Sequence, residues 1–570
     1  MTEIKTPLRI QSERFKLVYR ALSSLINKMG FKAWIVGGFV RDLLLNKKAE
    51  DIDIVVDVKS ILIFFDALKK IGLKSITFDK KDNENNVKFE VLKFRLTIDG
   101  LGYEDIDVAI PRKETYSKDS RKPSEVEFAK GGIKEDAKRR DLTINALYLK
   151  LGEENNIDEL FKKDGSINEC MVEKFVDDPT GEGLNNLWGY DEGCWVGEPV
   201  IKLTNKPEIL FEDDPLRILR VYRFLTKGFV FGAGVKEALH ESSKYFLVGT
   251  KISHDRIRDE FSKILLKSSP KESFQVTEIL ERMREDGILE LFLPKVSRMW
   301  GYDQNNSHHT MDLWGHTMAV LRYLKKSEKY NLSSNFMEKA GMEEDVISLK
   351  EAGLSTNRFS LYLCVLLAGL LHDVAKPETR STDEKGESHY YFHEKVSGEM
   401  AVEILNELKY TKDIQQLVKA IIERHMLLKD FRKSLTGRDD KKLRNLREKF
   451  IFEIHGKKVD IQNICLLLME ADDSSKGIKD ISEMKELRAD IEAFKEEWEN
   501  YLERVKLLPP PPKFKIEGEV VANHYNLLLP SIQLGKRIKE LKDFSNEVEA
   551  SSLEELMDIY DHQQNNYQFC

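Results

Sequence analysis

Two acidic side chains separated by one residue are the first group in this sequence that could do chemistry. Asp51 and Asp53 stand at the start of an apolar run that continues through Ile54, Val55 and Val56. Alternate residues of a β-strand share a face, so both carboxylates should point the same way. Two ionised carboxylates side by side repel each other unless a cation lies between them, and hard oxygen ligands beside a triphosphate favour Mg²⁺. The pair predicts a magnesium site for phosphate chemistry, against the alternative of a polar strand end that faces solvent.

A glycine pair precedes these carboxylates. The apolar run 33–36 leads into Gly37 and Gly38, and Arg41 follows one turn into a predicted helix. Glycines let a ligand approach the backbone closely, and the N–H groups of a helix N-terminus suit phosphate. The alternative is a tight strand-to-helix turn with a surface arginine. Asp107, in the later run DIDVAI, is either a third carboxylate of the same site or an acid that faces solvent.

Basic residues gather further along the chain. Between Arg112 and Arg140, ten basic residues stand against six acidic ones, in a chain whose net charge is −8. Arg140 could clamp a phosphate, and Asp141 could accept hydrogen bonds from ribose hydroxyls. The alternative is that Asp141 caps the helix that follows, with the arginines in a solvated turn. This segment is therefore a candidate nucleotide-binding region.

An arginine row follows in the string EDDPLRILRVYRF. Asp214 is predicted to cap a helix whose first residue is Pro215. Arg217, Arg220 and Arg223 recur every three residues on one side of that helix, and apolar residues take the other side. Stacked cations with no acids between them repel each other. The row predicts an anionic partner, against the alternative of ordinary exposed arginines.

Histidines are concentrated in one part of the chain. Seven of the twelve lie between His308 and His425. Imidazole and carboxylate groups brought together from distant segments suit a divalent metal, although isolated histidines are usually structural. The predicted metal-binding residues are His316, His372, Asp373, His393, His425 and Asp472. His308 and His309 are assigned to a loop.

Composition sets the frame for these sites. The 570 residues predict about three or four domains, and 33% charged residues with sparse glycine and proline favour a folded, helix-rich protein. Five scattered cysteines without a CxxC pair fit neither a disulfide framework nor a cysteine-zinc site. The longest apolar run, Phe359 to Leu371, is too short to span a bilayer. We expect a soluble protein without membrane contact that is cytoplasmic, although targeting to an organelle is not excluded.

Two kinds of periodicity predict the elements that hold the sites. A helix over 10–30 precedes strands at 33–36, 51–56 and within 89–110, which predicts an α/β region up to about residue 150. The remainder is predicted to be all-helical, with helices over 215–227, 255–267, 274–290, 312–325, 359–373, 396–409 and 414–428. Segment 326–358 is expected to be a polar surface insertion, and Pro509 to Pro512 a stiff linker.

Several of these strings together carry a family resemblance. Residues 30 to 270 resemble class II tRNA nucleotidyltransferases and bacterial-type poly(A) polymerases of the DNA polymerase β superfamily. The strings that carry the resemblance follow one another along the chain in the order GGFVRD, DID, RRDLTINAL, DPTGEGLNNL and DDPLRILRVYRF. The resemblance implies an α+β protein with an α/β head, followed by a helical neck, body and tail. The expected boundaries are 1–150, 151–270, 271–480 and 481–570. The string WGYDEGCWVGEP (188–199) departs from the family pattern and leaves the path of the neck open.

The resemblance also implies roles for matching residues. Asp51 and Asp53 would hold the catalytic Mg²⁺, while Gly38, Arg41 and Arg140 would contact the incoming nucleotide. Asp214 and Arg217 would bind the base of CTP or ATP, with Arg220 and Arg223 beside them. LLHDVAKPETR and YFHEKVSGEMA resemble the HD metal-dependent phosphohydrolases. That second resemblance makes His316, His372, Asp373 and Asp472 the ligands of Mg²⁺, Mn²⁺ or Ni²⁺, with His393 and His425 nearby.

The sequence thus favours an enzyme that adds CCA to tRNA 3′ ends from CTP and ATP, with a phosphohydrolase in the HD domain. Three alternatives remain: a poly(A) polymerase, an HD phosphohydrolase with a non-catalytic RNA-binding head, and a structural RNA-binding protein. The motifs do not separate the first of these from CCA addition. Segment 411–450, with twelve basic and six acidic residues, is a second candidate for contact with the tRNA backbone. The oligomeric state is left open.

Overall fold

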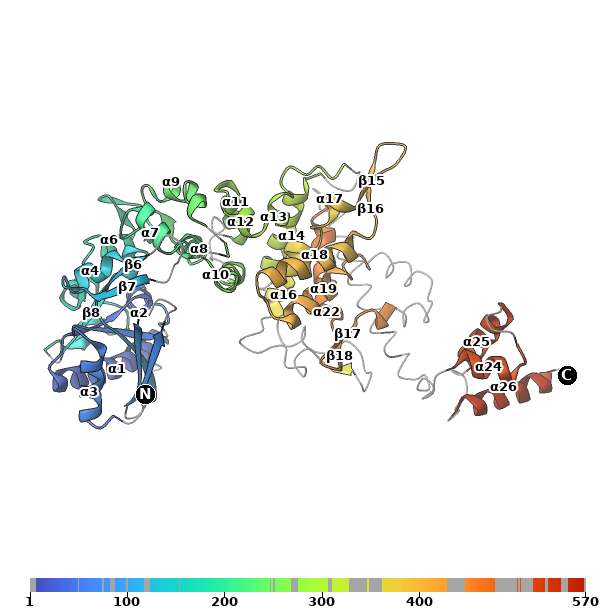
Figure 1. Cartoon of the computed structure of the whole chain (residues 1–570), viewed down its shortest axis with the longest axis horizontal. Coiled ribbons are helices and arrows are strands. Elements are labelled where there is room, and N and C mark those ends of the chain that lie inside the picture. The colour runs from blue at the N-terminus through green and yellow to red at the C-terminus, as the bar shows by residue number, and fades with distance from the viewer. Residues whose placement is uncertain are drawn as a thin grey trace. The chain divides into compact units, whose positions relative to one another are not determined.

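The computed structural model of the chain divides into two compact units (Figure 1). The first unit holds Met1–Asn335, Leu354–His425 and Ala471–Ile478, and the second holds Phe336–Gly353, Met426–Glu470 and Lys479–Cys570. The structure describes residues 7–49, 51–73, 76–82, 88–98, 101–116, 123–152, 154–246, 248–249, 252–267, 275–305, 310–327, 346–347, 361–427, 446–476, 500, 503, 516–527, 532–544 and 552–567. His308, His309, the proline linker and most of segment 326–358 lie outside these ranges.

A seven-stranded sheet forms the core of the N-terminal part of the first unit. The strands lie in the order β3, β4, β5, β2, β1, β8, β9, with β2 and β5 parallel and the other neighbours antiparallel. They are β1 (Ala33–Val36), β2 (Ile52–Val56), β3 (Ile76–Asp82), β4 (Lys88–Ile98), β5 (Gly102–Ala109), β8 (Tyr148–Leu151) and β9 (Val176–Asp177). The predicted strands at 33–36 and 51–56 are confirmed almost to the residue.

Helices and a hairpin complete this part. They are α1 (Pro7–Met29), α2 (Gly38–Leu44), α3 (Ile61–Lys70), α4 (Ile133–Lys138), and the paired strands β6 (Arg112–Tyr116) and β7 (Pro123–Phe128). Helix α1 buries Phe15, Tyr19, Leu22 and Ile26, which recur every three or four residues and so form one apolar face. The Tyr19 hydroxyl donates a hydrogen bond to the carbonyl oxygen of Lys150 at 2.7 Å, which fixes α1 against β8.

The chain beyond residue 150 is mainly helical, but the prediction that it is all-helical is corrected at several short strands. Strand β9 joins the main sheet, β10 (Tyr190–Asp191) and β11 (Cys194–Trp195) form a hairpin in the 188–199 segment, and β12 (Val200–Ile201) pairs with β13 (Val230–Phe231). Strands of two residues are too short to show an alternating pattern in the sequence. The neck helices are α5 (Val172–Phe175), α6 (Gly183–Leu187), α7 (Pro207–Asp213), α8 (Leu216–Leu225), α9 (Val235–His240) and α10 (His254–Leu266).

The histidine-rich part of the first unit is built around a buried helix. Ten of the eleven residues of α16 (Leu361–Leu371) are buried, and α16 packs against α14 (Leu313–Ser327) and α19 (Lys412–Ile422). Gly369 permits the close approach of α14, because a Cβ atom there would lie 2.5 Å from Leu324 Cδ1. The remaining elements are α11 (Val276–Glu285), α12 (Leu289–Phe292), α13 (Pro294–Ser297), α17 (Lys376–Thr379), β15 (Arg380–Thr382), β16 (Ser388–Tyr390) and α18 (His393–Glu407). Helix α22 (Gln462–Ser474) is divided between the units, and its last residues, from Ala471 on, belong to the first.

The second unit contains a small sheet and a three-helix cluster. The sheet has the order β14 (Val346–Ile347), β18 (Lys457–Asp460), β17 (Ile451–Ile454). The helices α24 (Gly518–His524), α25 (Ile532–Phe544) and α26 (Leu553–Tyr567) share an apolar core that includes Val521, Leu541 and Leu556. Among the described residues of both units, each helix is too short or too polar to cross a membrane.

Candidate functional site

A cleft of about 920 Å³ in the first unit gathers the residues predicted for catalysis and nucleotide binding. All ten line it: Gly38, Arg41, Asp51, Asp53, Arg140, Asp141, Asp214, Arg217, Arg220 and Arg223. In total ten basic and six acidic side chains surround the cleft, a positive balance in a chain whose net charge is −8. Such a concave positive surface concentrates anionic ligands. The individual roles of the ten predicted residues stay predictions, but the fold brings these residues together in one cleft.

The paired carboxylates lie where three strands meet. Asp51, the buried Ile52 and the exposed Asp53 alternate in burial, so the two acids share a face as predicted. The register places Asp107 of β5 directly beside Asp53. Partial burial, and next the neighbouring Asp107, raise the pKa of Asp53. A carboxylate whose pKa is raised by neighbouring carboxylates fits a site for a divalent cation, which would relieve the repulsion between them.

Asp107 itself has a cationic partner in the protein. Lys93 of β4 is its register neighbour, and Lys93 Nζ donates to both carboxylate oxygens at 2.8 and 2.6 Å. Asp107 is not among the residues that line the cleft, although its charge acts on Asp53. The structure therefore combines the two interpretations of this residue: it faces solvent, and it neighbours the carboxylate pair.

The glycine pair packs against two guanidinium groups. Gly37 has a φ of 76°, and a Cβ atom there would lie 3.5 Å from Arg140 Nη1, while one on Gly38 would lie 3.4 Å from Arg41 Nη2. Arg41 is held by a fork to Asp42 (2.8 and 2.6 Å) and by Asn145 Oδ1 (2.5 Å). The close turn thus lets two fixed cations lie beside the start of α2.

Arg140 and Asp141 are adjacent in one turn, but their side chains belong to different hydrogen-bond networks. Arg140 donates from Nε to the Tyr148 hydroxyl at 2.9 Å and pairs with the buried Asp136 at 3.2 Å. Asp141 accepts from Arg220 Nε at 2.7 Å, so the second basic segment and the arginine row are joined directly. Burial opposes ionisation of Asp141, but Arg220 outweighs it and holds the pKa of Asp141 well below its ordinary range. Asp141 also accepts a hydrogen bond from the N–H of Leu142 (2.9 Å), but Leu142 is itself the cap residue of the following 3₁₀-helix Thr143–Asn145, so Asp141 is not the helix cap of the alternative interpretation.

The arginine row finds partners within the chain, which the sequence did not predict. Arg220 pairs with Asp141, and Arg223 pairs with Glu260 of α10 at 3.1 Å. Arg217 donates to the carbonyl oxygens of Leu210 (3.0 Å) and Arg139 (2.8 Å). Their spacing along α8 therefore does not by itself require an external anion. The three guanidinium groups are held in fixed orientations at the wall of the cleft.

Helix α8 begins at Leu216, one residue later than predicted. Pro215 occupies the cap position, and Asp214 ends the preceding helix α7. Asp214 Oδ1 still accepts a hydrogen bond from the N–H of Leu216 at 3.2 Å, and Arg256 approaches its two oxygens at 3.3 and 3.4 Å. The predicted capping contact is present, displaced by one residue.

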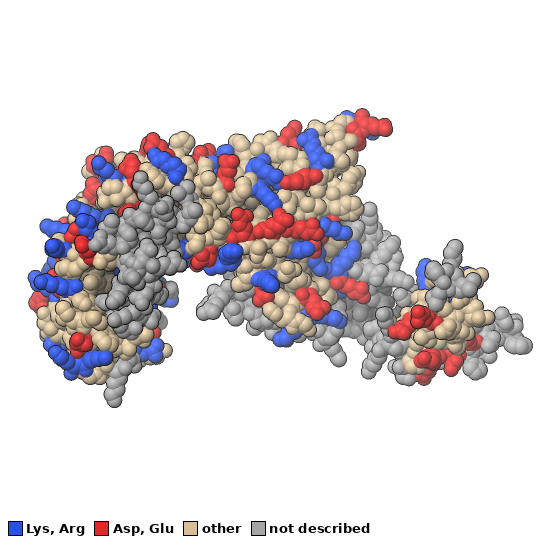
Figure 2. Space-filling model, in the orientation of Figure 1, with Lys and Arg blue, Asp and Glu red and all other residues tan. Residues whose placement is uncertain are grey.

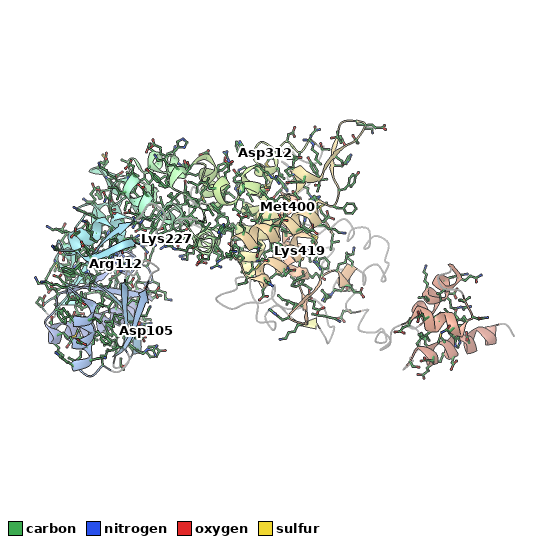
Figure 3. The ribbon with its side chains drawn as sticks, viewed as in Figure 1. Asp105, Arg112, Lys227, Asp312, Met400 and Lys419 are labelled. Carbon is green, nitrogen blue, oxygen red and sulfur yellow. The ribbon has the colours of Figure 1, made fainter. Side chains whose placement is uncertain are left out.

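Two lysines in the cleft were not predicted. Lys227 and Lys267 line it, and neither forms an ion pair with a described residue (Figure 3 labels Lys227 and Arg112 on its walls). Burial, followed by the charge of Arg41, lowers the pKa of Lys227 to about 7. Lys227 follows Arg223 by four residues, so the arginine spacing, continued past the helix end, could have indicated it. These lysines offer positive charge that no carboxylate of the described chain neutralises.

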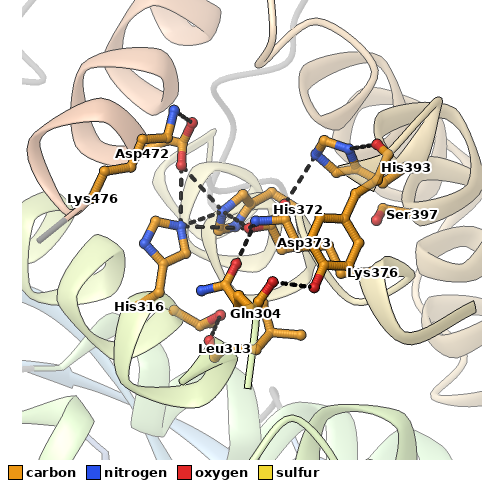
Figure 4. A network of polar contacts seen from close by, with 12 residues as sticks. Gln304, Leu313, His316, His372, Asp373, Lys376, His393, Ser397, Asp472 and Lys476 are labelled. Carbon is orange, nitrogen blue, oxygen red and sulfur yellow. Dashed lines mark hydrogen bonds and ion pairs between the residues drawn. The ribbon is translucent and has the colours of Figure 1, made fainter. Parts of the chain in front are cut away.

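A second cluster lies apart from the cleft, in the histidine-rich part. It contains the six residues predicted there: His316, His372, Asp373, His393, His425 and Asp472 (Figure 4 labels all of them except His425). They form two groups that could each hold a metal ion, His316–His372–Asp373–Asp472 and Asp373–His393–His425. Asp373 belongs to both groups. All six residues are buried.

Each of the four imidazoles is oriented by the backbone. The Nδ1 atoms of His316, His372, His393 and His425 lie 3.2, 2.9, 2.7 and 2.6 Å from the carbonyl oxygens of Ser475, Gly369, Tyr390 and Ile422. Because a carbonyl only accepts, each Nδ1 is the donor, and each Nε2 has a lone pair when its ring is neutral. The Nε2 atoms of His316 and His372 lie 3.3 Å apart, as do those of His393 and His425. Lone pairs at that separation require a proton or a metal ion between them.

Asp373 links the two imidazole pairs. Its Oδ2 lies 3.2 Å from His372 Nε2, and its Oδ1 lies 3.2 Å from His393 Nε2. Both oxygens are buried without a hydrogen-bond donor in good geometry, although Lys376 Nζ forms an ion pair with Oδ2 at 2.7 Å. Buried carboxylate oxygens without a well-placed hydrogen-bond donor are stabilised by an additional positive charge nearby. The donor set therefore fits one or two divalent cations.

The electrostatics of the cluster agree with this. Burial lowers the pKa of His372, but Asp373 and Asp472 outweigh it and raise the pKa to about 9. Burial, and then His372 and His393, lower the pKa of His425 to about 3. The carboxylates thus favour positive charge at the centre of the cluster. The imidazoles lie so close together that protonation of several of them at the same time is unfavourable. Two lysines, Lys376 and Lys476, support the acids from outside; Lys476 Nζ lies 2.8 Å from Asp472. Neither lysine was predicted, although Lys376 stands three residues after Asp373 and Lys476 four residues after Asp472.

Comparisons with known proteins match both sites to described families. Residues 33–166 match the poly A polymerase head domain, residues 235–299 match the probable RNA and SrmB-binding site of polymerase A, and residues 314–474 match the HD domain. Over these three segments the chain is therefore similar to polymerase A proteins and to HD-domain proteins. Its head match spans both the glycine pair and the carboxylates, and its HD match contains all six residues of the metal cluster.

Curated CCA-adding enzymes match about half of the chain. A CCA-adding enzyme of Lactobacillus johnsonii is 31% identical over 252 residues, which are 44% of this chain and 50% of that protein. The mitochondrial CCA tRNA nucleotidyltransferase of Candida glabrata is 29% identical over 315 residues, 53% of this chain and 50% of that protein. The chain thus spans about half the length of these curated relatives. A solved CCA-adding enzyme with ATP aligns over 98% of each chain, with 17% identity and a TM-score of 0.49.

Proposed function

We propose that this protein adds C, C and A to the 3′ end of tRNA, using CTP and ATP without a nucleic-acid template. The observation that carries the proposal is that one cleft is lined both by the carboxylates Asp51 and Asp53 at the start of β2 and by the arginines of α8. The names of the relatives in Lactobacillus johnsonii and Candida glabrata support it. A non-catalytic RNA-binding head is disfavoured, since binding alone gives no reason for adjacent carboxylates in a cleft meant for phosphates.

Each group of cleft residues has its own task in the transfer. Lys227 and Lys267 would attract the triphosphate, and Arg41 and Arg140 would orient it beside the glycine turn. Asp51 and Asp53 would hold Mg²⁺, which lowers the pKa of the attacking 3′-hydroxyl and neutralises charge on the triphosphate. The hydroxyl oxygen then forms a bond to the α-phosphorus, pyrophosphate leaves, and no covalent bond to the protein forms. Positioning and charge supply the catalysis.

The nucleotide requirement tests this function. A tRNA that lacks its terminal three nucleotides should gain two residues with CTP alone and three with CTP plus ATP. With ATP alone, addition should be poor. Gel separation of the labelled tRNA measures this. Repeated addition of adenosine from ATP alone, on tRNA and on unrelated RNA, would instead establish the poly(A) polymerase alternative.

Base choice should depend on Asp214 and Arg217. Two N–H groups of Arg217 bond backbone carbonyls, which fixes the guanidinium so that its remaining donors can meet a base edge. We expect Asp214→Asn and Arg217→Lys to raise misincorporation of U and G by about tenfold or more, since a paired contact to a base edge contributes ~1–3 kcal/mol of discrimination. Competition between CTP and UTP measures the ratio. A variant that stays strictly selective, with only weaker nucleotide binding, would contradict the role.

Triphosphate affinity should depend on the protonation of Lys227. Its pKa of about 7 means that the ammonium is largely neutralised by pH 8.5. Because only the charged form attracts phosphate, affinity for CTP should fall on the order of tenfold between pH 6.5 and 8.5 through this one linked proton. Lys227→Met should bind more weakly at pH 6.5 and lose this part of the dependence, whereas the exposed Lys236→Met should behave like the wild type. Calorimetric titration with CTP checks it, and identical pH profiles for all three proteins would refute the assignment.

We propose that the histidine cluster is a metal-dependent phosphohydrolase site, and that its substrate is a small phosphoester such as a 2′,3′-cyclic phosphate or a 2′-nucleotide. His316, His372, Asp373 and Asp472 would hold one ion, and His393 and His425 would hold a second with the shared Asp373. A bound divalent ion would supply an activated water and polarise the phosphoryl oxygen. The protein fixes the imidazole tautomers through backbone carbonyls and supports the acids through Lys376 and Lys476. The alternative is a purely structural metal.

A further inference from the structure

Two large aromatic side chains stand exposed immediately before a residue of the metal cluster. Tyr391 and Phe392 are 65% and 66% exposed, and His393 follows them as the first residue of α18. The neighbouring hairpin of β15 and β16 projects beyond α17 and α18 (Figure 1). Single exposed apolar residues are common, but a pair of exposed rings next to a candidate catalytic site is not explained by packing.

The backbone at Phe392 is also strained. Its φ is 60°, in the left-handed region that a bulky residue rarely adopts, and it occupies the cap position of α18. Glycine would fit this conformation, and a short polar residue would cap the helix better. The sharp turn directs His393 inward, with its Nδ1 on the carbonyl of Tyr390, and leaves both rings outside. Strain of this kind is characteristic of functional sites.

The rings lie at the side where the cluster approaches solvent. Among the four imidazoles, His393 has the most exposed side chain, at 7%, whereas His316 and His372 are fully covered. A substrate that approached the cluster beside His393 would lie next to the two residues that precede it. Tyr391 is stacked on His389, with ring centroids 5.6 Å apart and planes inclined by 19°, so one of its faces is already fixed and the other is open.

The charged side chains around Tyr391 and Phe392 favour a phosphate on one side of the two rings and disfavour it on the other. Lys395 Nζ lies 5.6 Å from the centre of the Phe392 ring, on the helix that carries His393. The tip of the hairpin is acidic on balance instead, with Asp383, Glu384 and Glu387 against the single Lys385 (Figure 2). A phosphate would be drawn towards Lys395 and the cluster, and repelled from the tip. Flat aromatic faces beside a phosphate-binding site suit a nucleobase, because every base has a π-face that can stack.

We propose that Tyr391 and Phe392 form a base-stacking platform, which holds the nucleobase of a terminal nucleotide while its phosphoester lies at the metal cluster. The proposal rests on the phosphohydrolase function proposed above and deepens it, because it assigns the residues that select a nucleotide over other phosphoesters. The platform binds the base and takes no part in the bond cleavage. Its stacked partner His389 holds Tyr391 in place.

The test compares a phosphoester that carries a base with one that does not. Guanosine 2′,3′-cyclic phosphate is suitable, because the head cleft is proposed to accept cytosine and adenine, and ribose 2,3-cyclic phosphate is its baseless match. In the metal-loaded full chain, Tyr391→Ala with Phe392→Gly should raise KM for the guanosine ester about tenfold or more, with unchanged metal content. This follows from a stacking contribution of ~1–3 kcal/mol per base. KM for the baseless ester and kcat for both should stay unchanged.

Conservative variants separate stacking from a structural effect. Tyr391→Phe and Phe392→Trp should retain the low KM, since both keep an aromatic face, and Glu399→Ala, at an exposed position of α18, serves as a matched control. Equal changes for both esters, or no change for either, would overturn the platform. If the wild type hydrolyses neither ester, the phosphohydrolase proposal fails. The platform is then judged separately by equilibrium dialysis of guanosine 2′-monophosphate, where equal binding by wild type and double variant would overturn it.

Discussion

Asp53→Asn should reduce nucleotide addition on the order of a thousandfold while leaving the protein folded. The carboxylate pair is the proposed anchor of Mg²⁺, and a bound metal ion contributes several kcal/mol to stabilisation of the transition state. The substitution keeps the shape of the side chain and removes its charge. Initial rates of CTP incorporation into a tRNA that lacks CCA measure the effect.

The electrostatics of β2 make this variant informative about chemistry alone. Burial and Asp107 already raise the pKa of Asp53, so the folded protein disfavours its charge, and a neutral amide should not lower the melting temperature. Asp57→Asn is the matched control, because Asp57 is an exposed acid just past the same strand. It should incorporate CTP at the wild-type rate. Near-normal addition by purified Asp53→Asn would refute the metal-binding role.

The second large effect should come from the histidine cluster. His372→Asn together with Asp373→Asn should remove bound divalent metal and abolish phosphoesterase activity, because the pair contributes to both groups of the cluster. Addition of CCA should continue within about twofold, since the cleft residues are unaffected. Metal analysis and hydrolysis of a 2′,3′-cyclic phosphate with Mg²⁺, Mn²⁺ or Ni²⁺ are the measurements.

A folding control is necessary for this pair of substitutions. Lys376 is buried and bonds Gln304 at 2.8 Å as well as Asp373, so it keeps one partner when the carboxylate is replaced by an amide. His240→Ala, at a side chain that is 72% exposed, should alter neither metal content nor hydrolysis. Retention of metal and full hydrolysis by the double variant would contradict the assignment. The assignment would also be contradicted if the wild type failed to hydrolyse such an ester with each of the three ions.

The parts of the sites that short-range patterns determine could be predicted from the sequence. The alternation at Asp51 and Asp53 defined the exposed face of β2, and the apolar run before His372 defined α16. Both depend on neighbours a few residues away. The long-range partners could not be predicted in this way. Arg220 meets Asp141 and Arg223 meets Glu260 only because α8 packs between segments distant in sequence.

The other unpredicted features have similar physical causes. The strands β10 to β13 have two residues each, so they are defined by tertiary pairing and not by their own periodicity. The lowered pKa of Lys227 depends on burial and on Arg41, which the sequence places far away. The left-handed turn at Phe392 contradicts local preference, because a phenylalanine replaces the glycine or asparagine that this conformation favours. The backbone at Phe392 thus departs from the conformational preference of its residue type, and it does so beside a candidate site.

Sequencing of the 3′ ends that the protein produces is the direct test of CCA addition. A tRNA ending before its CCA would be incubated with equal concentrations of all four nucleoside triphosphates and Mg²⁺, and the products would be sequenced. We predict that wild-type products end in CCA and stop there, and that Asp53→Asn leaves the substrate unextended. Runs of adenosine, or products with mixed bases of no fixed length, would contradict the account.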